Sequence, residues 1–457
     1  MRAAFAIFSL LAGCATTPPQ SVYKEESRSQ PQSLTERPFY SGYGEAIGVQ
    51  PVHWTARSIA RDFDRLMFQT EWGESVPRLL KWEKPATISL STPELASYRP
   101  FLDDLVTRIR NAAPGLDVSA TGGPNADITL RSAPRTEMDE IAANALCFFI
   151  PYDVTWAEFK SLDARDAAGW SQISKLDKIT VFIPAFAAPH EIRSCILEEV
   201  TQALGPGNDL RYLNDSIFND DNAHVWPTGF DLLILRTLYN DTLRNGLNSD
   251  EAALEARSVL RSEPLGGLTR TIDLIGSKYD TALMIAENET DFVLRKQALQ
   301  AAISLAKTQG AAPHRLGEAY KTAAFVAFEA NDPDRVVDYL SKAELAHARA
   351  LAANSVHLAR VRSELAINLI NLENHDTGLA LLELAEPVFA ANGSDWQLTH
   401  ALRWRAIALS QLGRWAEASG TALEALDWAR YVYGGGSRAV ASWRQEFVDI
   451  GLIPASG

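Results

Sequence analysis

The sequence lacks the motifs that define several common enzyme classes. It contains no Gly-x-Ser-x-Gly elbow, no phosphate-binding loop of the Walker type and no Cys-x-x-Cys pair. These absences exclude the usual serine-hydrolase, nucleotide-binding and dithiol chemistries. After the first residues, no segment has the roughly 18 consecutive apolar residues that a membrane-spanning helix requires.

Positive charge is also in short supply. The 457 residues include 43 Lys and Arg against 57 Asp and Glu, which gives a formal net charge of −14 at pH 7. An acidic chain is a poor partner for nucleic acid or for an anionic membrane surface. We therefore expect no nucleic-acid partner. The length exceeds what one ordinary core holds, so we expect two domains or more.

Cysteine occurs only at positions 14, 147 and 195. The first lies in Leu11-Ala12-Gly13-Cys14, directly after a short apolar run. This segment resembles the bacterial lipobox, which implies that residues 1–14 are a signal peptide with a lipid-bearing cysteine at its end. The resemblance implies a protein anchored in the bacterial cell envelope through Cys14 and facing the periplasm. Ala15, rather than an aspartate, follows the cysteine, and in this the segment resembles lipoproteins that are sorted to the outer membrane.

The other two cysteines, Cys147 and Cys195, are a candidate disulfide in an oxidising compartment. Two separate buried thiols are the alternative. Residues 15–45 are rich in Pro, Ser, Gln and Glu, with few residues able to build a core. This composition predicts a disordered tether.

The region 46–255 has the pattern of an α+β domain. Apolar alternation and apolar runs predict strands at 86–90, 116–120, 126–130 and 178–183. A helix is expected from about 188 to 204, because Gly205-Pro206-Gly207 stops it. A mixed sheet carrying one conspicuous helix is therefore predicted.

That helix and the loop after it resemble the zinc-binding motif of metzincin proteases, H-E-x-x-H-x-x-G-x-x-H. Glu198, Gln202 and Asn208 stand at the three histidine positions, whereas Glu199 and Gly205 keep the general-base and glycine positions. Three further segments resemble that family in the same order: residues 126–128, residues 215–219 with Phe218 at the methionine place, and residues 228–239. The combination also resembles an uncharacterised lipoprotein-associated domain family of bacterial envelopes.

The replaced histidines decide which chemistry is expected. Catalytic zinc needs three nitrogen, sulfur or carboxylate ligands and an open position for water. Glu198 offers one carboxylate, but Gln202 and Asn208 are neutral amides and bind zinc poorly. We therefore expect no metal and no cofactor, with packing and turn formation as the roles of these residues.

Two metal sites remain alternatives to this expectation. One is a zinc site in which Glu199 is the general base. The other is a calcium site built from oxygen ligands. Its candidate ligands are Asn208, Asp209, Asn214, Asp215, Asn219, Asp220 and Asp221.

Alanine recurs regularly in the helix-rich part, residues 274–440. Ala282, Ala324, Ala366 and Ala406 are separated by 42, 42 and 40 residues, and a second set, Ala301, Ala343, Ala385 and Ala425, follows 19 residues after each. The phase resembles the tetratricopeptide repeat, in which small residues let two helices of a hairpin pack closely. An alanine-rich helical bundle is the alternative. Residues 256–273 are predicted to be a linker and residues 441–457 a C-terminal segment.

The sequence therefore favours a binding or scaffolding protein over an enzyme. The predicted partners are an envelope protein or peptide, held by the helical repeats, and the membrane, reached through the lipid on Cys14. The alternative is a divergent metal-dependent peptidase in which Glu199 is the general base.

Overall fold

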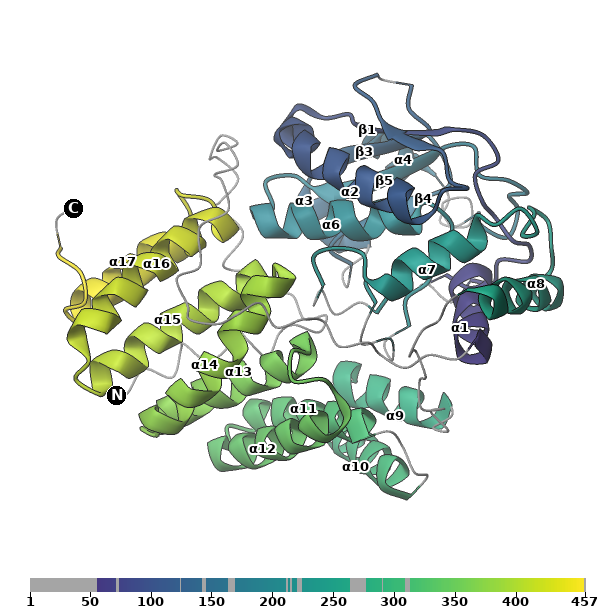
Figure 1. The fold of residues 1–457 in the computed structure, drawn as a ribbon. Coiled ribbons are helices and arrows are strands. Elements are labelled where there is room, and N and C mark those ends of the chain that lie inside the picture. The colour runs from purple at the N-terminus through teal and green to yellow at the C-terminus, as the bar shows by residue number, and fades with distance from the viewer. Residues whose placement is uncertain are drawn as a thin grey trace. The chain divides into compact units, whose positions relative to one another are not determined.

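The computed structural model describes residues 56–70, 74–123, 125–141, 145–162, 169–210, 213, 216–219, 224–263, 277–289, 291–308 and 313–455. The predicted signal peptide, Cys14 and the predicted tether lie outside these residues. The described residues form two units, an α+β unit up to residue 263 and a helical unit from residue 277 (Figure 1). None of the described helices combines the length and the apolar character needed to span a bilayer.

The α+β unit is built on a five-stranded mixed sheet with the order β2-β1-β3-β5-β4. The first four strands in this order run parallel, and β4 pairs antiparallel with β5. The strands are β1 (Ala86–Leu90), β2 (Val118–Ala120), β3 (Ile128–Ala133), β4 (Phe148–Ile150) and β5 (Ile179–Pro184). The predicted mixed sheet is thus confirmed, with β4 as a strand that the sequence pattern does not reveal.

Strand β5 shows that the sheet is buried on both faces. All six of its residues are buried, as expected of a parallel strand inside a sheet that is covered on both sides. Val181 and Ile183 belong to the main core, whereas Phe182 between them packs with Phe148 and Phe159 in a second cluster. The alternation assigns these side chains to opposite faces.

Helices cover both faces of the sheet. On the main-core side lie α2 (Arg99–Ala112), which follows the 3-10 helix η1 (Pro93–Tyr98), and α6 (Pro189–Gln202). The second face carries α3 (Arg135–Ile141) and α4 (Trp156–Ser161). Figure 1 shows α2 and α6 alongside the strands. The remaining helices of this unit are α1 (Ala56–Phe68), α7 (Gly229–Leu238) and α8 (Ser249–Ser262), and α1 packs on α8.

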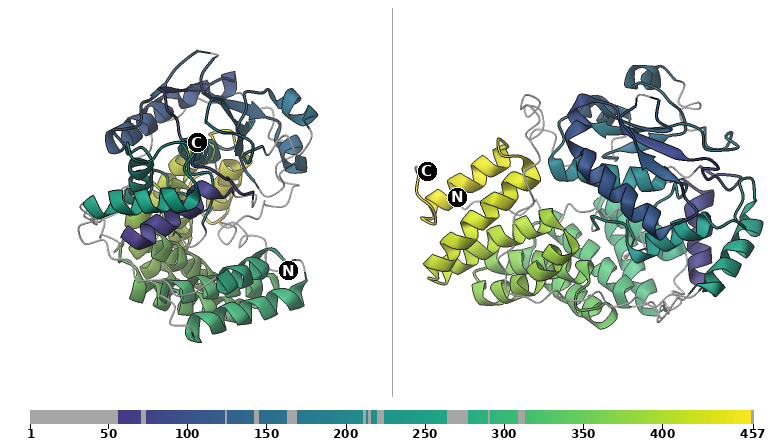
Figure 2. Two further views of the ribbon diagram at one scale, coloured as in Figure 1. Left: turned by 90° about the vertical axis from the view of Figure 1, so that its right-hand side faces the viewer. Right: turned by 45° about the horizontal axis from the view of Figure 1, so that its top comes forward.

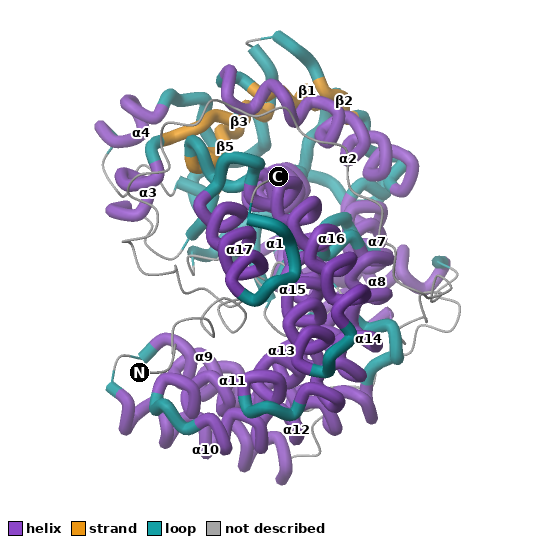
Figure 3. Tube along the Cα trace, turned by 90° about the vertical axis from the view of Figure 1, so that its left-hand side faces the viewer, coloured by secondary structure: helices purple, strands orange, loops and turns teal. Residues whose placement is uncertain are grey.

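The helical unit consists of hairpins that follow one another along the chain, as the green-to-yellow part of Figure 2 and the tube in Figure 3 show. Each helix packs against the next. The hairpins are α9 (Ser277–Asn288) with α10 (Phe292–Thr308), α11 (Pro313–Glu329) with α12 (Pro333–Ala350), α13 (Val356–Asn371) with α14 (His375–Asn392), and α15 (Asp395–Gln411) with α16 (Trp415–Tyr433). The predicted helical-repeat region is confirmed, and α17 (Arg438–Asp449) follows it.

The turns of three hairpins share one backbone feature. Asn331, Glu373 and Gly413 all have positive φ, at 55°, 65° and 75°. They lie where the first helix of each hairpin ends, at spacings close to those of the alanines. A left-handed residue at this place ends a helix and lets the chain reverse.

The alanine phase holds with one exception. Ala343, Ala385 and Ala425 are fully buried, but Ala301 is exposed and its neighbour Ala302 is buried instead. Helix α10 is therefore one residue out of phase with the second helices of the later hairpins, because its core position falls at 302, whereas Ala282 on α9 is buried in phase. The closely packed position that the alanine spacing assigns to Ala301 is taken by Ala302.

Two helices cross the predicted domain boundaries. Helix α8 continues to Ser262, whereas the prediction ends its domain at residue 255. Helix α17 spans the predicted boundary at residue 440. Both are continuous amphipathic helices, with apolar side chains packed inward.

Candidate functional site

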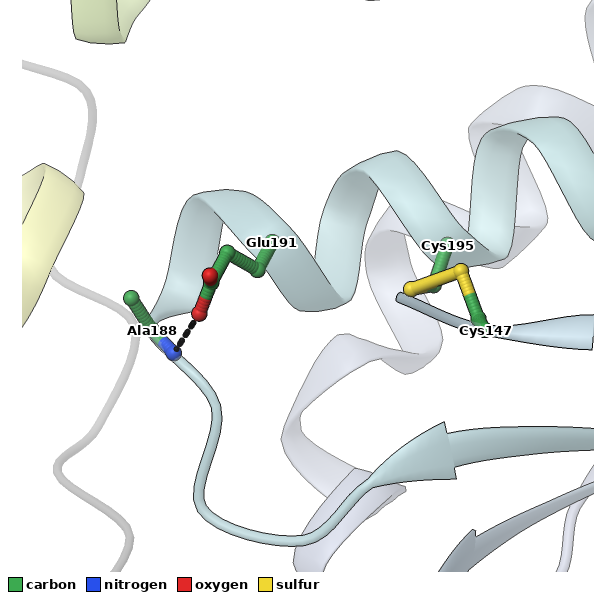
Figure 4. Close-up of a disulfide and its surroundings, with 4 residues drawn as sticks. All are labelled: Cys147, Ala188, Glu191 and Cys195. Carbon is green, nitrogen blue, oxygen red and sulfur yellow. Dashed lines mark hydrogen bonds between the residues drawn. A yellow bond between two sulfur atoms is a disulfide. The ribbon is translucent and has the colours of Figure 1, made fainter. Parts of the chain in front are cut away.

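The motif helix α6 is fixed at its start and along one side. It begins at Pro189, and the Glu191 carboxylate accepts a hydrogen bond of 2.8 Å from the Ala188 backbone N–H, as Figure 4 shows. Its buried side includes Ile192, Cys195, Ile196 and Val200. The packing fixes the rotation of the helix about its axis, and with it the directions of the two central glutamates.

The two glutamates have different surroundings. Glu199 is 4% exposed, whereas Glu198 is partly exposed. Both are engaged in interactions within the protein. The residue at the general-base position is therefore buried in the frame of the domain, and the residue at the first ligand position lies near its surface.

The other two ligand positions are used to hold the loop after α6. The Gln202 Nε2 donates a hydrogen bond of 3.0 Å to Asp209 Oδ1. The Asn208 Nδ2 donates one of 3.0 Å to the backbone carbonyl of Arg65 on α1. Both amide side chains are buried. These bonds support the packing role expected for the amides.

Gly205 allows the sharp turn between those two residues. Its φ is +138°, a conformation that L side chains rarely adopt. A Cβ at this position would lie 2.5 Å from Leu238 Cδ2. The glycine of the motif is thus required by the backbone and by the close approach of α7, independently of any metal.

A buried aspartate holds the turn that follows. Asp231, fully buried near the start of α7, accepts hydrogen bonds from the Ser216 hydroxyl at 2.5 Å and from the backbone N–H groups of Ile217 and Thr228. Burial raises the pKa of the Asp231 carboxyl, and this effect exceeds the opposite effect of these hydrogen bonds. Phe218 at the methionine place of the resemblance is fully buried.

The calcium candidates are only partly described. Asn214, Asp215, Asp220 and Asp221 lie outside the described residues. Of the others, Asn208 and Asp209 take part in the hydrogen bonds given above, and Asn219 is buried. Within the described ranges, no group of three or more His, Cys, Asp or Glu side chains is arranged to hold a metal ion.

Cys147 and Cys195 form a disulfide, with their Cα atoms 5.8 Å apart (Figure 4). It joins the segment before the edge strand β4 to the middle of α6. The sequence left this pairing open, and the structure makes the bond a direct brace between the sheet edge and the motif helix.

A second group of polar side chains, in the helical unit, was not foreseen from the sequence. The Glu318 Oε1 on α11 lies 3.3 Å from His347 Nε2 on α12, and the Glu318 carboxylate lies 3.6 Å from Lys321 Nζ. Arg360 and Glu364 on α13 interact with the same charges. We call these five residues the buried charge cluster.

The charges in this cluster shift the pKa values of its carboxyl groups in opposite directions. Burial raises the pKa of Glu318, but the charges of Lys321 and its neighbours outweigh burial and lower it to about 2. Burial raises the pKa of Glu364 to about 7, against the lowering effect of Lys321 and Arg360. Burial also lowers the pKa of His347. The cluster therefore contains one firmly ionised carboxylate and one that titrates near neutral pH.

A repeat signal could have located this cluster. Glu318, Arg360 and His400 follow one another at the alanine spacing of 42 and 40 residues, on the first helices α11, α13 and α15. A polar residue at one fixed position of successive hairpins is visible in the sequence once the repeat is aligned. Its burial is not visible there.

Comparison with known proteins gives a family without an assigned function for part of the chain. Residues 56–257 match the model of the family described as protein of unknown function, DUF2927. The match runs from α1 into α8 and so spans most of the α+β unit. No curated protein matches the chain.

Among the solved structures that match part of the chain is one of TPR-like repeats. It is a crystal structure of nearly identical TPR-like repeats from Podosopora anserina, described as belonging to a kinesin light chain. The identity is 14% and the TM-score 0.30, over 38% of this chain and 92% of that chain. The helical repeats of this chain are shown by its own succession of helix hairpins.

Proposed function

We propose that this chain is a binding or scaffolding protein of the bacterial cell envelope, in which a metzincin-like frame without protease chemistry is joined to a helical-repeat platform. The observation that carries the proposal is the use of Gln202 and Asn208. Both stand at ligand positions of the resemblance, and each donates its amide to a protein acceptor. Amides used in this way stabilise the loop and α1, so the frame gains stability where a protease would hold its metal.

The repeat platform supports binding of an envelope protein or peptide. Helical repeats build extended surfaces that commonly bind proteins. In this chain, Glu318, Arg360 and His400 place a polar residue at the same position of three successive hairpins. A buried charged pair is weak support for stability, so fixed helix register is the better reason for buried charges such as Glu318 and Arg360.

The location remains part of the proposal. The lipobox-like segment ending at Cys14 supports a lipid anchor that holds the protein on the periplasmic side of the outer membrane. Labelling cells with an alkyne fatty acid tests this directly. The full chain is expected to incorporate the label, and the Cys14→Ser variant is expected to lose it. A labelled Cys14→Ser variant contradicts the anchor.

The absence of protease chemistry is tested by metal content and cleavage together. The full chain, extracted from envelopes without chelator, is analysed for bound metals by mass spectrometry and screened against a peptide library. We expect no stoichiometric zinc and no cleavage that differs between the wild type and Glu199→Gln. One equivalent of zinc, with cleavage lost in Glu199→Gln, overturns the scaffold proposal.

The second candidate is the divergent metal-dependent peptidase. It is favoured by one observation, the retention of a buried carboxylate, Glu199, at the general-base position of a well-ordered helix. A metal in such a site would use Glu198 and ligands from outside the motif, with Glu199 activating a bound water. Calcium held by the oxygen side chains after α6 would instead support a structural role.

A further inference from the structure

The first hairpin of the helical unit exposes an apolar surface. Five large hydrophobic residues within eleven positions of α9 and α10 are exposed, whereas residues of this kind are normally scattered singly. Their exposed fractions are Met284 50%, Ile285 37%, Phe292 37%, Val293 61% and Leu294 47%. This concentration marks one end of the described helical unit as a contact surface.

The opposite end of the unit is covered. Helix α17 buries Val440, Trp443 and Phe447 against the last hairpin, and among its described residues none is an exposed large hydrophobic. Repeat proteins need such a capping element, with a polar outer face, at each end for solubility. Helix α17 supplies it at the C-terminal end. No hairpin precedes α9 in the described part of the helical unit.

Later hairpins show what the exposed surface is built to contact. Ala319 on α11 is buried in a cluster with Ala302 and Ala306 of α10, and Ala323 on α11 is buried against Leu299. Each hairpin thus packs one side against the hairpin before it. No hairpin of the described helical unit covers the corresponding side of α9–α10.

A groove lies between α9 and α10, and Ile285 of the exposed apolar residues lines it. Its volume is about 410 Å³. It is lined by Lys278, Thr281, Ala282, Ile285, Gln297, Ala298 and Ala301. The alanines provide a shallow floor where a larger apolar side chain of another helix can insert. The one-residue phase difference of α10 places Ala301 in this floor.

The surface of α9 is complementary to itself. Lys278 and Ile285 lie on one stripe of α9, and Glu289, the residue directly after the helix, continues that stripe, because seven and eleven residues correspond closely to two and three turns. If a second α9 runs antiparallel across a two-fold axis near residues 283 and 284, Lys278 of one copy faces Glu289 of the other. The same axis sets Ile285 of each copy against Ala282 of the other. Opposite charges then meet at both ends, with an apolar contact between them.

We propose that the chain forms a two-fold dimer through the α9–α10 surface, with a second copy of α9 in the groove. A two-fold contact uses the same patch on both copies and closes on itself. Head-to-tail stacking would require an open C-terminal end, and α17 covers that end. The proposal does not depend on the function proposed above.

Cross-linking in intact cells tests which surface meets its copy. The full chain carries one added thiol, either Ile285→Cys on α9 or, as the control, Leu423→Cys on α16, which is 53% exposed at the wild-type residue. A short bismaleimide is expected to give a species near twice the 50.2 kDa of the chain for Ile285→Cys and none for Leu423→Cys. Equal cross-linking of both variants overturns the proposal. A species of another mass shows a different partner and also overturns it.

Charge exchange tests the antiparallel arrangement. Sedimentation velocity of the detergent-solubilised full chain is compared for Lys278→Glu, Glu289→Lys and the double variant. Each single change is expected to weaken the dimer several-fold, because it places like charges together, and the double change is expected to restore it. Ile285→Asp, at a position where the wild-type side chain is 37% exposed, is expected to weaken the dimer at least about tenfold. A double variant as weak as the single ones, or a wild type that stays monomeric, contradicts the proposal.

Discussion

The His347 imidazole on α12 lies directly against the backbone of Gly317 on α11. A Cβ at position 317 would stand 2.0 Å from His347 Cδ2 and 2.4 Å from Nε2. His347 is fully buried, so the ring has no open space to move into. The close approach brings its Nε2 to 3.3 Å from Glu318 Oε1 and thereby joins α11 to α12.

Gly317→Ala is therefore expected to destabilise the helical unit. Overpacking of this kind costs about 1–3 kcal/mol, which exceeds the gain of about 1 kcal/mol from replacing glycine inside a helix. Denaturant unfolding followed by circular dichroism measures the difference. Gly420→Ala on α16 is the matched control, because nothing lies within 4 Å of a Cβ there. It is expected to stabilise, and equal effects of the two changes would contradict the close packing.

The Glu364 carboxyl on α13 is expected to make the stability of the helical unit depend on pH. Its pKa rises from 4.5 to about 7 on folding, so the folded state binds the extra proton between these values. Its contribution to stability is fully present below pH 4.5 and is lost as the pH rises through 7, by up to about 3 kcal/mol. Urea unfolding at pH 5 and pH 8 measures it.

Glu364→Gln is the variant that isolates this effect. His347 has a lowered pKa, so its contribution grows as the pH rises towards 6.5 and partly opposes that of Glu364. The contribution of Glu318 is lost only as the pH falls from 4.5 towards 2. Raising the pH from 5 to 8 should therefore lower the free energy of unfolding of the wild type relative to that of Glu364→Gln. An unchanged difference would show that Glu364 does not titrate in this range.

Much of the sheet is readable from the sequence, since its strands are apolar and short. The pattern at 86–90 gives the bounds of β1, and the run at 178–183 is within one residue of β5. Strand β4 is not predicted, because Phe148–Ile150 is only three residues long and all three side chains are buried. Neither alternation nor length therefore distinguishes it from other short apolar segments. The alanine spacing predicts the hairpins for a physical reason, because close helix packing requires small side chains.

The candidate site is less readable. The spacing of Gln202 and Asn208 indicates a motif, but the acceptor of Asn208 is the Arg65 carbonyl on α1, 143 residues earlier in the chain, so this contact depends on how α1 packs against the loop after α6. The buried charge cluster is hidden for a related reason: Glu318 and Glu364 read as solvated helix residues until three helices come together. Sequence spacing locates such residues on a helix, whereas burial and partners are set by tertiary packing.

Loss of the Cys147–Cys195 bond is expected to destabilise the α+β unit. The bond closes a loop with a sequence separation of 48 residues, and a cross-link of this span stabilises by roughly 2–4 kcal/mol. Cys147→Ala and Cys195→Ala should lower the unfolding temperature equally. Reductant should lower it in the wild type and leave both variants unchanged. A wild type insensitive to reductant under unfolding conditions would contradict a stabilising disulfide.

Asp231→Asn tests the anchor of the turn that follows the motif helix in the chain. The Asp231 carboxylate accepts from the Ser216 hydroxyl and from two backbone N–H groups, so an amide nitrogen in place of one oxygen leaves at least one buried donor without an acceptor. The expected cost is about 1–3 kcal/mol. Ser216→Ala removes only one donor and should cost less, about 1 kcal/mol. Thermal unfolding of both variants gives the order, and hydrogen exchange of the Ile217 amide locates the effect. If Ser216→Ala costs as much as Asp231→Asn, the turn is held by the hydroxyl and the backbone contacts contribute nothing measurable.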